Sequence, residues 1–122
     1  MFSLNSTFRY YFYKSVTDMR KGFDGLCGLV HCELGRRPVS GEVFIFVNRQ
    51  RDKIKLLHWE QGGFVLYYKR LESGTFELPR VNTARKSCQI RWSSLMLMIE
   101  GISIEKYKQR RRYFINNFLP AS

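Results

Sequence analysis

Aromatic and β-branched residues gather in short runs separated by turn-forming residues, a pattern that predicts strands. The first run, residues 8–13, is almost wholly aromatic, and bulky rings fit a pleated strand better than a helix. Residues 41–48, 53–60 and 63–70 form three more runs joined by two short turns, which predicts an antiparallel meander. Apolar residues fall on both faces of some of these strands, so both faces of the sheet are expected to be covered.

Apolar residues spaced three and four positions apart predict a helix in the N-terminal third. Thr17 or Asp18 is expected to cap this helix, which is expected to end at Leu34 with Gly35 beyond its last turn. Three glycines lie inside this span: Gly22, Gly25 and Gly28. Each weakens a helix by about 1 kcal/mol relative to Ala, and close approach to a sheet is the expected offsetting reason.

The C-terminal third predicts less regular structure. Residues 76–78 are expected to form a short strand, and the polar, basic segment 80–86 is expected to be an exposed linker. Apolar positions at 95–99 predict a short helix, and a basic helix whose docking is left open is expected over 103–119. The whole chain, residues 1–122, is expected to form a single α+β domain: a small antiparallel β-meander of about four to five strands packed with one N-terminal helix and C-terminal helices.

The charge balance points to the class of partner. The 122 residues include 21 Lys and Arg against 10 Asp and Glu, a formal net charge of +11. A polyanion is therefore the expected partner, and both nucleic acid and an anionic membrane surface satisfy this condition. No apolar run approaches the roughly 20 residues that span a bilayer, and the N-terminus lacks the order of a signal peptide. We expect a cytoplasmic protein that binds nucleic acid, DNA first, and no membrane.

The residues that could carry catalysis form no recognised pattern. Three cysteines occur at spacings that match no common zinc or redox motif: Cys27, Cys32 and Cys88. Metal-dependent strand transfer would need several acids to converge, and nothing in the spacing of the candidates requires it: Asp18, Asp24, Asp52 and Glu60. Glycine-rich nucleotide-binding motifs are absent from the sequence. We therefore expect no enzyme, no metal and no cofactor.

The most informative cationic pattern crosses the predicted turn that follows residue 48. Four basic residues alternate there with other residues: Arg49, Arg51, Lys53 and Lys55. Alternation in an extended backbone points side chains one way, so we expect a cationic row that could bind phosphates. Nearby rings and cations complete this candidate nucleic-acid surface: Trp59, Tyr67, Tyr68, Lys69 and Arg70. The alternative is that charged hairpins merely prevent edge-to-edge aggregation, and the net charge favours binding.

A second candidate phosphate site consists of Arg20 and Lys21. The pattern places both in the first turn of the predicted helix, where cations oppose the helix dipole. An anion bound there would contact both side chains and the unpaired backbone N–H groups of that turn. Tolerance of surface charge explains the same placement equally well.

Several segments, in order along most of residues 10–102, resemble one protein family. The first is Thr17-Asp18-Met19-Arg20-Lys21-Gly22, followed by Asp24-Gly25-Leu26. The second comprises Phe46, Asn48, Arg49, Arg51, Asp52, Lys53, Lys55, Leu56, Leu57 and Trp59. The last are Gly63-Phe64, Leu66-Tyr67-Tyr68-Lys69-Arg70-Leu71-Glu72 and Ile99-Glu100-Gly101-Ile102. Together they resemble the TnpB accessory proteins of the insertion-sequence-66 family, also called Orf2-like proteins.

The resemblance implies a gene carried beside a separate transposase and a protein needed for efficient transposition. The implied partners are the transposase and other proteins of the same element. It supplies no catalytic residues to carry over. The sequence departs from the family at His58, where a tyrosine or another residue is more usual, and the tail after Ile102 has no counterpart in the resemblance.

Three functions stay open on these grounds. The first is a DNA-binding accessory factor that docks on element ends or target DNA through the basic hairpin. The second is a protein-interaction module, a homodimer in one version, whose aromatic residues and two-faced strands bind the transposase. The third is an RNA-associated regulator that uses the same cations and rings.

Overall fold

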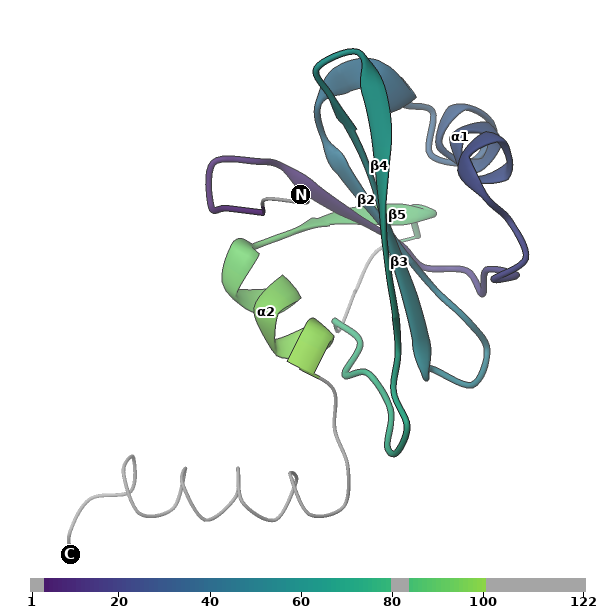
Figure 1. The fold of residues 1–122 in the computed structure, drawn as a ribbon, viewed down its shortest axis with the longest axis vertical. Helices are drawn as coiled ribbons and strands as arrows, with labels where there is room; N and C mark the ends of the chain where they lie inside the picture. The colour runs from purple at the N-terminus through teal and green to yellow at the C-terminus, as the bar shows by residue number, and fades with distance from the viewer. Residues whose placement is uncertain (1–3, 80–83, 101–122) are drawn as a thin grey trace, which may run out of the picture.

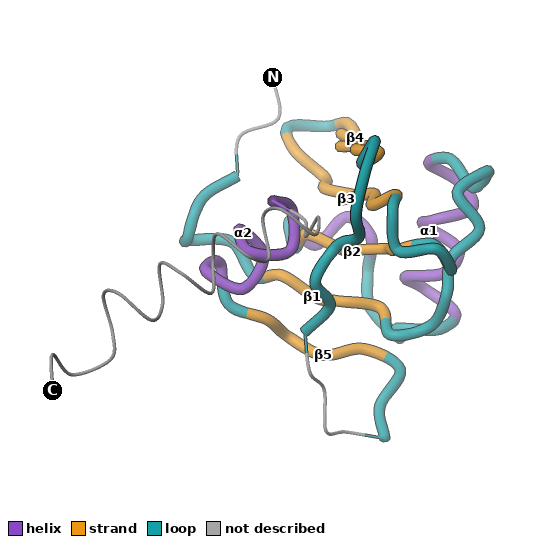
Figure 2. The backbone as a smooth tube through the Cα atoms, turned by 90° about the horizontal axis from the view of Figure 1, so that it is seen from below, coloured by secondary structure: helices purple, strands orange, loops and turns teal. Residues whose placement is uncertain are grey.

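One five-stranded sheet carries a helix on each of its faces (Figures 1 and 2). The structure is a computed structural model that describes residues 4–79 and 84–100. Its elements, in chain order, are β1 (Tyr10–Tyr13), α1 (Phe23–Cys32), a short 3-10 helix η1 (Pro38–Ser40), β2 (Val43–Val47), β3 (Lys53–Glu60), β4 (Gly63–Arg70), β5 (Ser87–Ile90) and α2 (Trp92–Glu100). The α+β fold class is confirmed.

The strand order is β4-β3-β2-β1-β5, with β4 and β5 at the two edges (Figure 2). The predicted meander is confirmed, since β2, β3 and β4 pair antiparallel and the predicted bounds of β3 and β4 match the structure. The sheet is nevertheless mixed, because β1 and β2, which come before and after α1 in the chain, pair in parallel. A parallel pair needs a crossover connection, and α1 provides it.

Alternation along the strands divides the buried residues between two cores. Odd and even positions of a strand face opposite sides, so neighbours such as Tyr11 and Phe12 belong to different cores. The core under α2 is built from Tyr10, Phe12, Val43, Ile45, Leu95 and Met98, among others. The core under α1 is built from Tyr11, Tyr13, Phe44, Phe46, Leu26 and Val30, among others. The expectation of a sheet covered on both faces is therefore correct.

The first helix begins later than predicted. It starts at Phe23 after Gly22, and neither Thr17 nor Asp18 caps it. The reason lies in Asp18, whose carboxylate accepts hydrogen bonds from the Arg20 backbone N–H at 2.9 Å and from the Arg20 guanidinium at 2.7 Å. A side chain that bonds two residues ahead closes a turn, so the chain turns once before the helix begins.

The glycines in and just before α1 do not mark a close approach to the sheet. A Cβ atom added at Gly22 or Gly28 would meet nothing within 4 Å, and one at Gly25 would meet only the Lys21 side chain at 3.1 Å. That expectation is wrong. Gly35 is different, because its φ of +64° lies in the left-handed region that follows many helices.

Two glycine substitutions should therefore change stability in opposite directions. Gly35→Ala is expected to lower the free energy of unfolding by about 1 kcal/mol, since an L-residue resists the left-handed region. Gly28→Ala is expected to raise it by about 0.5–1 kcal/mol, since Gly28 is exposed inside a helix with space for a methyl group. Urea unfolding followed by circular dichroism measures both, and a loss of stability in both variants would contradict this assignment.

The C-terminal third differs from the prediction in two places. Residues 76–78 form no strand. Phe76 is buried, and its backbone N–H donates to the Arg51 carbonyl at 2.7 Å rather than to a neighbouring strand. A strand that was not predicted, β5, pairs with β1. The predicted short helix is confirmed as α2, and the helix expected over 103–119 lies outside the described residues.

The expected linker 80–86 falls partly outside the described residues, and its described positions 84–86 are exposed. In the described ranges, no helix is both long and apolar enough to cross a membrane.

Candidate nucleic-acid interface

A groove opens on the α1 face of the sheet, between the loop before α1 and the turn that joins β2 to β3. Its volume is about 650 Å³. It is lined by loop residues 16–20, by turn residues 48–50, by Lys53 and by Tyr68 on β4. We call it the hairpin groove. It joins two segments that are about thirty positions apart in the chain.

Lys55 attaches the loop to the sheet. Its side chain is only 5% exposed, and its ammonium donates to the carbonyls of Met19 and Lys21, each at 2.8 Å. The ammonium also lies 4.6 Å from the centre of the Tyr68 ring. Two carbonyls and one ring face satisfy the three donors of an ammonium. Burial lowers the pKa of Lys55, which is a structural cation beneath the groove.

Asn48 organises the turn at the other wall of the groove. Its side-chain oxygen accepts the backbone N–H groups of Asp52 at 3.1 Å and Lys53 at 3.0 Å. Its amide donates to the Asp52 carboxylate at 2.6 Å and to Gln50 at 3.2 Å. The hydrogen bond from Asn48 lowers the pKa of Asp52 below its usual range. The buried Asn48 amide therefore fixes the turn that places Arg49 and Lys53 in the lining of the groove.

The predicted cationic row does not exist as a row. Arg49 and Arg51 lie in the turn, and Arg51 has a φ of +60°, so extended alternation stops before β3 begins at Lys53. Lys55 is buried rather than displayed. Only Arg49 and Lys53 of the four line the hairpin groove. The correction follows from the turn, where the backbone is not extended and the two-residue period fails.

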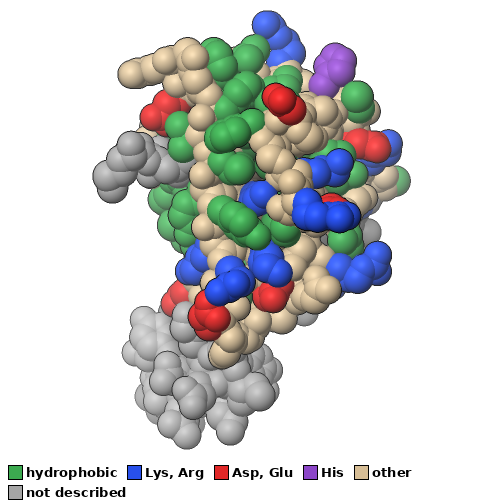
Figure 3. Space-filling model, turned by 45° about the vertical axis from the view of Figure 1, so that its right-hand side comes forward, with side chains coloured by type: hydrophobic (Ala, Val, Ile, Leu, Met, Phe, Trp, Pro, Cys, Tyr) green, Lys and Arg blue, Asp and Glu red, His purple; other side chains and the backbone are tan. Residues whose placement is uncertain are grey.

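Two residues of β4 join this face. Register places Tyr68 opposite Lys55 and Arg70 opposite Lys53, so both side chains lie on the α1 face. The Tyr68 side chain is 51% exposed, and Arg70 forms an exposed ion pair with Glu72 at 3.0 Å. Figure 3 shows Lys and Arg side chains gathered over the middle and lower part of the visible surface, with a few acidic side chains between them.

The remaining predicted surface residues lie elsewhere. Tyr67 and Lys69 are on the opposite face, where Lys69 donates to the Ile99 carbonyl in α2 at 2.9 Å. Trp59 is on the α1 face but at the far end of β3, against Phe64 with ring centres 4.9 Å apart. It lies six positions along the strand from Lys53, a span of roughly 20 Å. The structure thus gathers some of the predicted surface and disperses the rest.

Arg20 and Lys21 precede the helix rather than forming its first turn. The Arg20 guanidinium pairs with Asp18 at 2.7 Å, and its hydrogen bonds lower the pKa of Asp18 to about 2. Arg20 lines the hairpin groove, whereas the Lys21 carbonyl accepts from Lys55. The expected site at the helix N-terminus is thus corrected, because the turn closed by Asp18 displaces both cations from the helix.

Other groups in the described ranges do not assemble into a metal site. Across residues 4–79 and 84–100, no group of three or more His, Cys, Asp and Glu side chains is placed to bind a metal ion. Burial raises the pKa of the Cys27 and Cys88 thiols.

Comparison with known proteins gives a family match that includes the segments forming the groove. The family model described as "IS66 Orf2 like protein" matches residues 8–109. The chain belongs to this family. The family connects this Orf2-like protein with an insertion sequence, as an accessory protein. Loop residues 17–22 and turn residues 48–53, which carry much of the resemblance, meet at the hairpin groove.

Two relatives of this Orf2-like protein come from Sinorhizobium fredii (strain NBRC 101917 / NGR234). The uncharacterized protein y4jC is 29% identical over 93 residues, which cover 76% of this chain and 78% of that protein. The uncharacterized protein y4hO is 39% identical over 64 residues, 52% of this chain and 55% of that protein. No solved structure matches the chain.

Proposed function

We propose that this Orf2-like protein assists transposition by binding DNA along the hairpin groove. One observation carries the proposal: two segments that carry the family resemblance converge on a groove that displays Arg20, Arg49 and Lys53 beside the exposed ring of Tyr68. Asp18 is the only carboxylate that lines this groove in the described part of the chain. Cations beside an exposed ring suit a ligand made of phosphates and flat bases.

The chemistry favours binding over catalysis. Neither Arg49 nor Lys53 forms an ion pair with an acidic side chain among the described residues, so both are available to phosphates. Asp18 and Asp52 are engaged by Arg20 and Asn48, which supports an accessory role without a catalytic site. Phosphate contacts release counterions, so affinity should fall steeply with salt.

Charge reversal in the groove tests the proposal. Arg49→Glu combined with Lys53→Glu is expected to weaken binding to duplex DNA at least about ten-fold and to reduce the salt slope of the logarithm of affinity by about two. The matched control is Arg9→Glu with Arg91→Glu, which makes the same change of net charge at exposed positions outside the groove. Fluorescence anisotropy with element-end duplex, unrelated duplex and single-stranded RNA measures the affinities.

The result separates three outcomes. A larger loss in the groove variant than in the control supports DNA binding at the groove. Equal losses would show that affinity follows overall charge and would remove the groove from consideration. Tighter binding of RNA than of either duplex would replace DNA binding with the RNA-regulator function.

A second candidate function, binding of the transposase, is favoured by the edge strand β4. Among the described strands this one pairs only with β3, and Phe64 and Leu66 are only partly buried on its α1 face. Edge strands with partly exposed apolar side chains are common docking sites for other chains. A complex with the transposase that survives high salt, together with no DNA binding, would favour this function over the first.

A further inference from the structure

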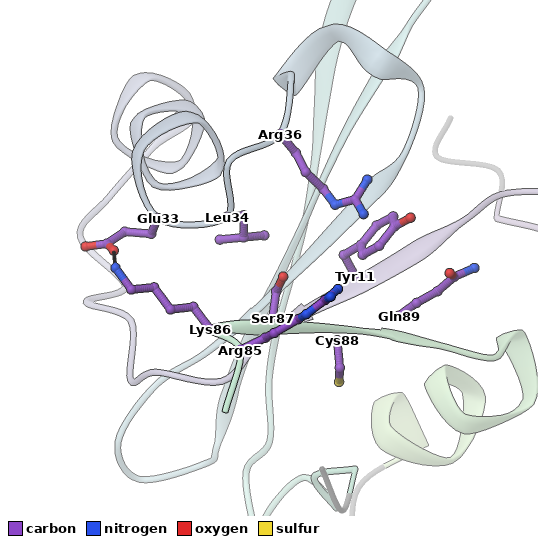
Figure 4. A pocket seen from close by; sticks show the side chains of 9 residues that line it. All are labelled: Tyr11, Glu33, Leu34, Arg36, Arg85, Lys86, Ser87, Cys88 and Gln89. Atoms are coloured by element: carbon purple, nitrogen blue, oxygen red, sulfur yellow. Dashed lines mark hydrogen bonds and ion pairs between the residues drawn. The ribbon is translucent and has the colours of Figure 1, made fainter. Parts of the chain in front are cut away.

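A second cavity lies on the same face of the sheet, at the opposite end of α1. Its volume is about 550 Å³. Tyr11, the segment after α1 and residues 85–89 line it (Figure 4). We call it the β5 pocket. None of its lining residues lines the hairpin groove, and none belongs to the predicted cationic surface.

Arg36 is fixed in this pocket as a flat platform. Its guanidinium carbon lies 3.6 Å from the centre of the Tyr11 ring. Its Nη1 donates to both carboxylate oxygens of Glu42, at 3.3 and 3.1 Å, and the Ser40 hydroxyl donates to Glu42 at 3.0 Å. A guanidinium held by a ring and a carboxylate loses little freedom on binding. Arginine planes held in this way stack well on unpaired bases.

The floor of the pocket offers hydrogen-bonding groups beside that platform. Register places Gln89 opposite Tyr11 and Ser87 opposite Tyr13, so both polar side chains lie on the α1 face of β5. Cys88 points to the other side of the sheet (Figure 4). An amide and a hydroxyl supply both donors and acceptors, which suits the polar edge of a base.

The rim of the pocket is cationic. Arg85 and Lys86 line it, and Lys86 pairs with Glu33 (Figure 4). With Arg36, three cations lie near two carboxylates, Glu33 and Glu42, and this cationic rim suits a phosphate. The cavity volume also lies within the usual range for small-ligand sites.

We propose that the β5 pocket binds one unpaired nucleotide of a DNA strand, with the base stacked on Arg36, its edge facing Gln89 and Ser87, and its phosphate near Arg85. The inference takes from the proposed function only the class of ligand. It uses no residue of the hairpin groove, so each site can fail without the other.

A pair of oligonucleotides tests the pocket. One is a single-stranded hexadeoxynucleotide, and the other has the same phosphates but abasic sugars, so the ratio of their affinities measures base contacts alone. In the wild-type protein the normal strand is expected to bind about ten-fold more tightly. Arg36→Lys keeps the charge but loses the plane, and the ratio should fall several-fold. The neighbouring exposed Arg37→Lys is the matched control and should leave the ratio unchanged.

Further variants distinguish the two sites. Tyr68→Ala removes the exposed ring of the hairpin groove and with it any base contact made there, and Arg36→Lys is expected to lower the ratio more than Tyr68→Ala does. A ratio that is lost in Tyr68→Ala and kept in Arg36→Lys would place the base contact in the groove and overturn the pocket. No ratio in the wild-type protein would also overturn it, even if duplex binding stays intact. Gln89→Ala, at an exposed position, repeats the test if Arg36→Lys does not fold. A hexaribonucleotide of higher affinity would replace DNA with RNA as the ligand.

Discussion

Replacing Lys55 by Met is expected to lower the free energy of unfolding by about 2–3 kcal/mol. The variant keeps the apolar stem but removes the ammonium that donates to the carbonyls of Met19 and Lys21. Hydrogen bonds from a charged donor contribute about 1.5–3 kcal/mol each, and the relieved burial of the charge offsets part of that loss. Urea unfolding measures the change, and proteolysis of the loop before α1 should become faster.

Lys53→Met provides the matched control. Lys53 lies two residues earlier on the same face but is only partly buried, so this variant should change stability by no more than about 0.5 kcal/mol. The DNA affinities should show the opposite contrast, because Lys53 lines the groove directly. Equal stabilities for the two variants would contradict the structural role of Lys55.

Lys55 also shows what strand alternation cannot predict, which is the depth of burial of a side chain. Strand alternation correctly placed it on the same face as Lys53, and the predicted bounds of β3 match the structure. Alternation does not say how deeply a side chain lies, which depends on the loop that folds over it. The neighbouring residues give one local hint, because Lys55 lies between Ile54 and Leu56, which are both fully buried.

The elements that were missed share one physical cause. Strand β5 contains Ser87 and Gln89, so its local pattern is too polar to predict a strand, and it forms through pairing with β1. The parallel pairing of β1 with β2 is likewise invisible locally, since it depends on where α1 returns the chain. Long-range pairing overrides local preference in both cases. The β5 pocket was missed for the same reason.

The loop before α1 illustrates a competition between two local signals. Asp18 has the chemistry of a helix cap, and the sequence alone favours that role. Arg20 offers the same carboxylate a guanidinium and a backbone N–H two residues away, and this turn takes precedence. The result moves Arg20 away from the helix and onto the hairpin groove. Because Asp18 was predicted to cap the helix, Arg20 and Lys21 were expected in its first turn, whereas both precede the helix.

Replacing Asn48 by Ala is expected to cost about 2–3 kcal/mol of stability and to weaken DNA binding. The variant removes the acceptor of the Asp52 and Lys53 backbone N–H groups and the donor to the Asp52 carboxylate. Without these bonds the turn no longer fixes Arg49 beside the groove. Gln50→Ala is the control, because Gln50 is exposed and accepts only one side-chain bond from Asn48 in the described structure. An equal loss in both variants would contradict the role of Asn48.

Asn48→Asp gives the same turn a pH dependence of opposite sign. In the wild-type protein the amide of Asn48 lowers the pKa of Asp52, so the stability it contributes is present above the unfolded pKa, near 4, and is lost as the pH falls through the lower folded value. The variant places two carboxylates where the amide and Asp52 now lie 2.6 Å apart, and repulsion raises one pKa above the unfolded value. The stability contributed by this carboxyl is full below its unfolded pKa, near 4, and is lost as the pH rises through the higher folded value. As the pH falls from 7 to 5, the variant should therefore gain stability relative to the wild-type protein, which urea unfolding at each pH measures. Parallel profiles of stability against pH for the two proteins would show that positions 48 and 52 are not coupled.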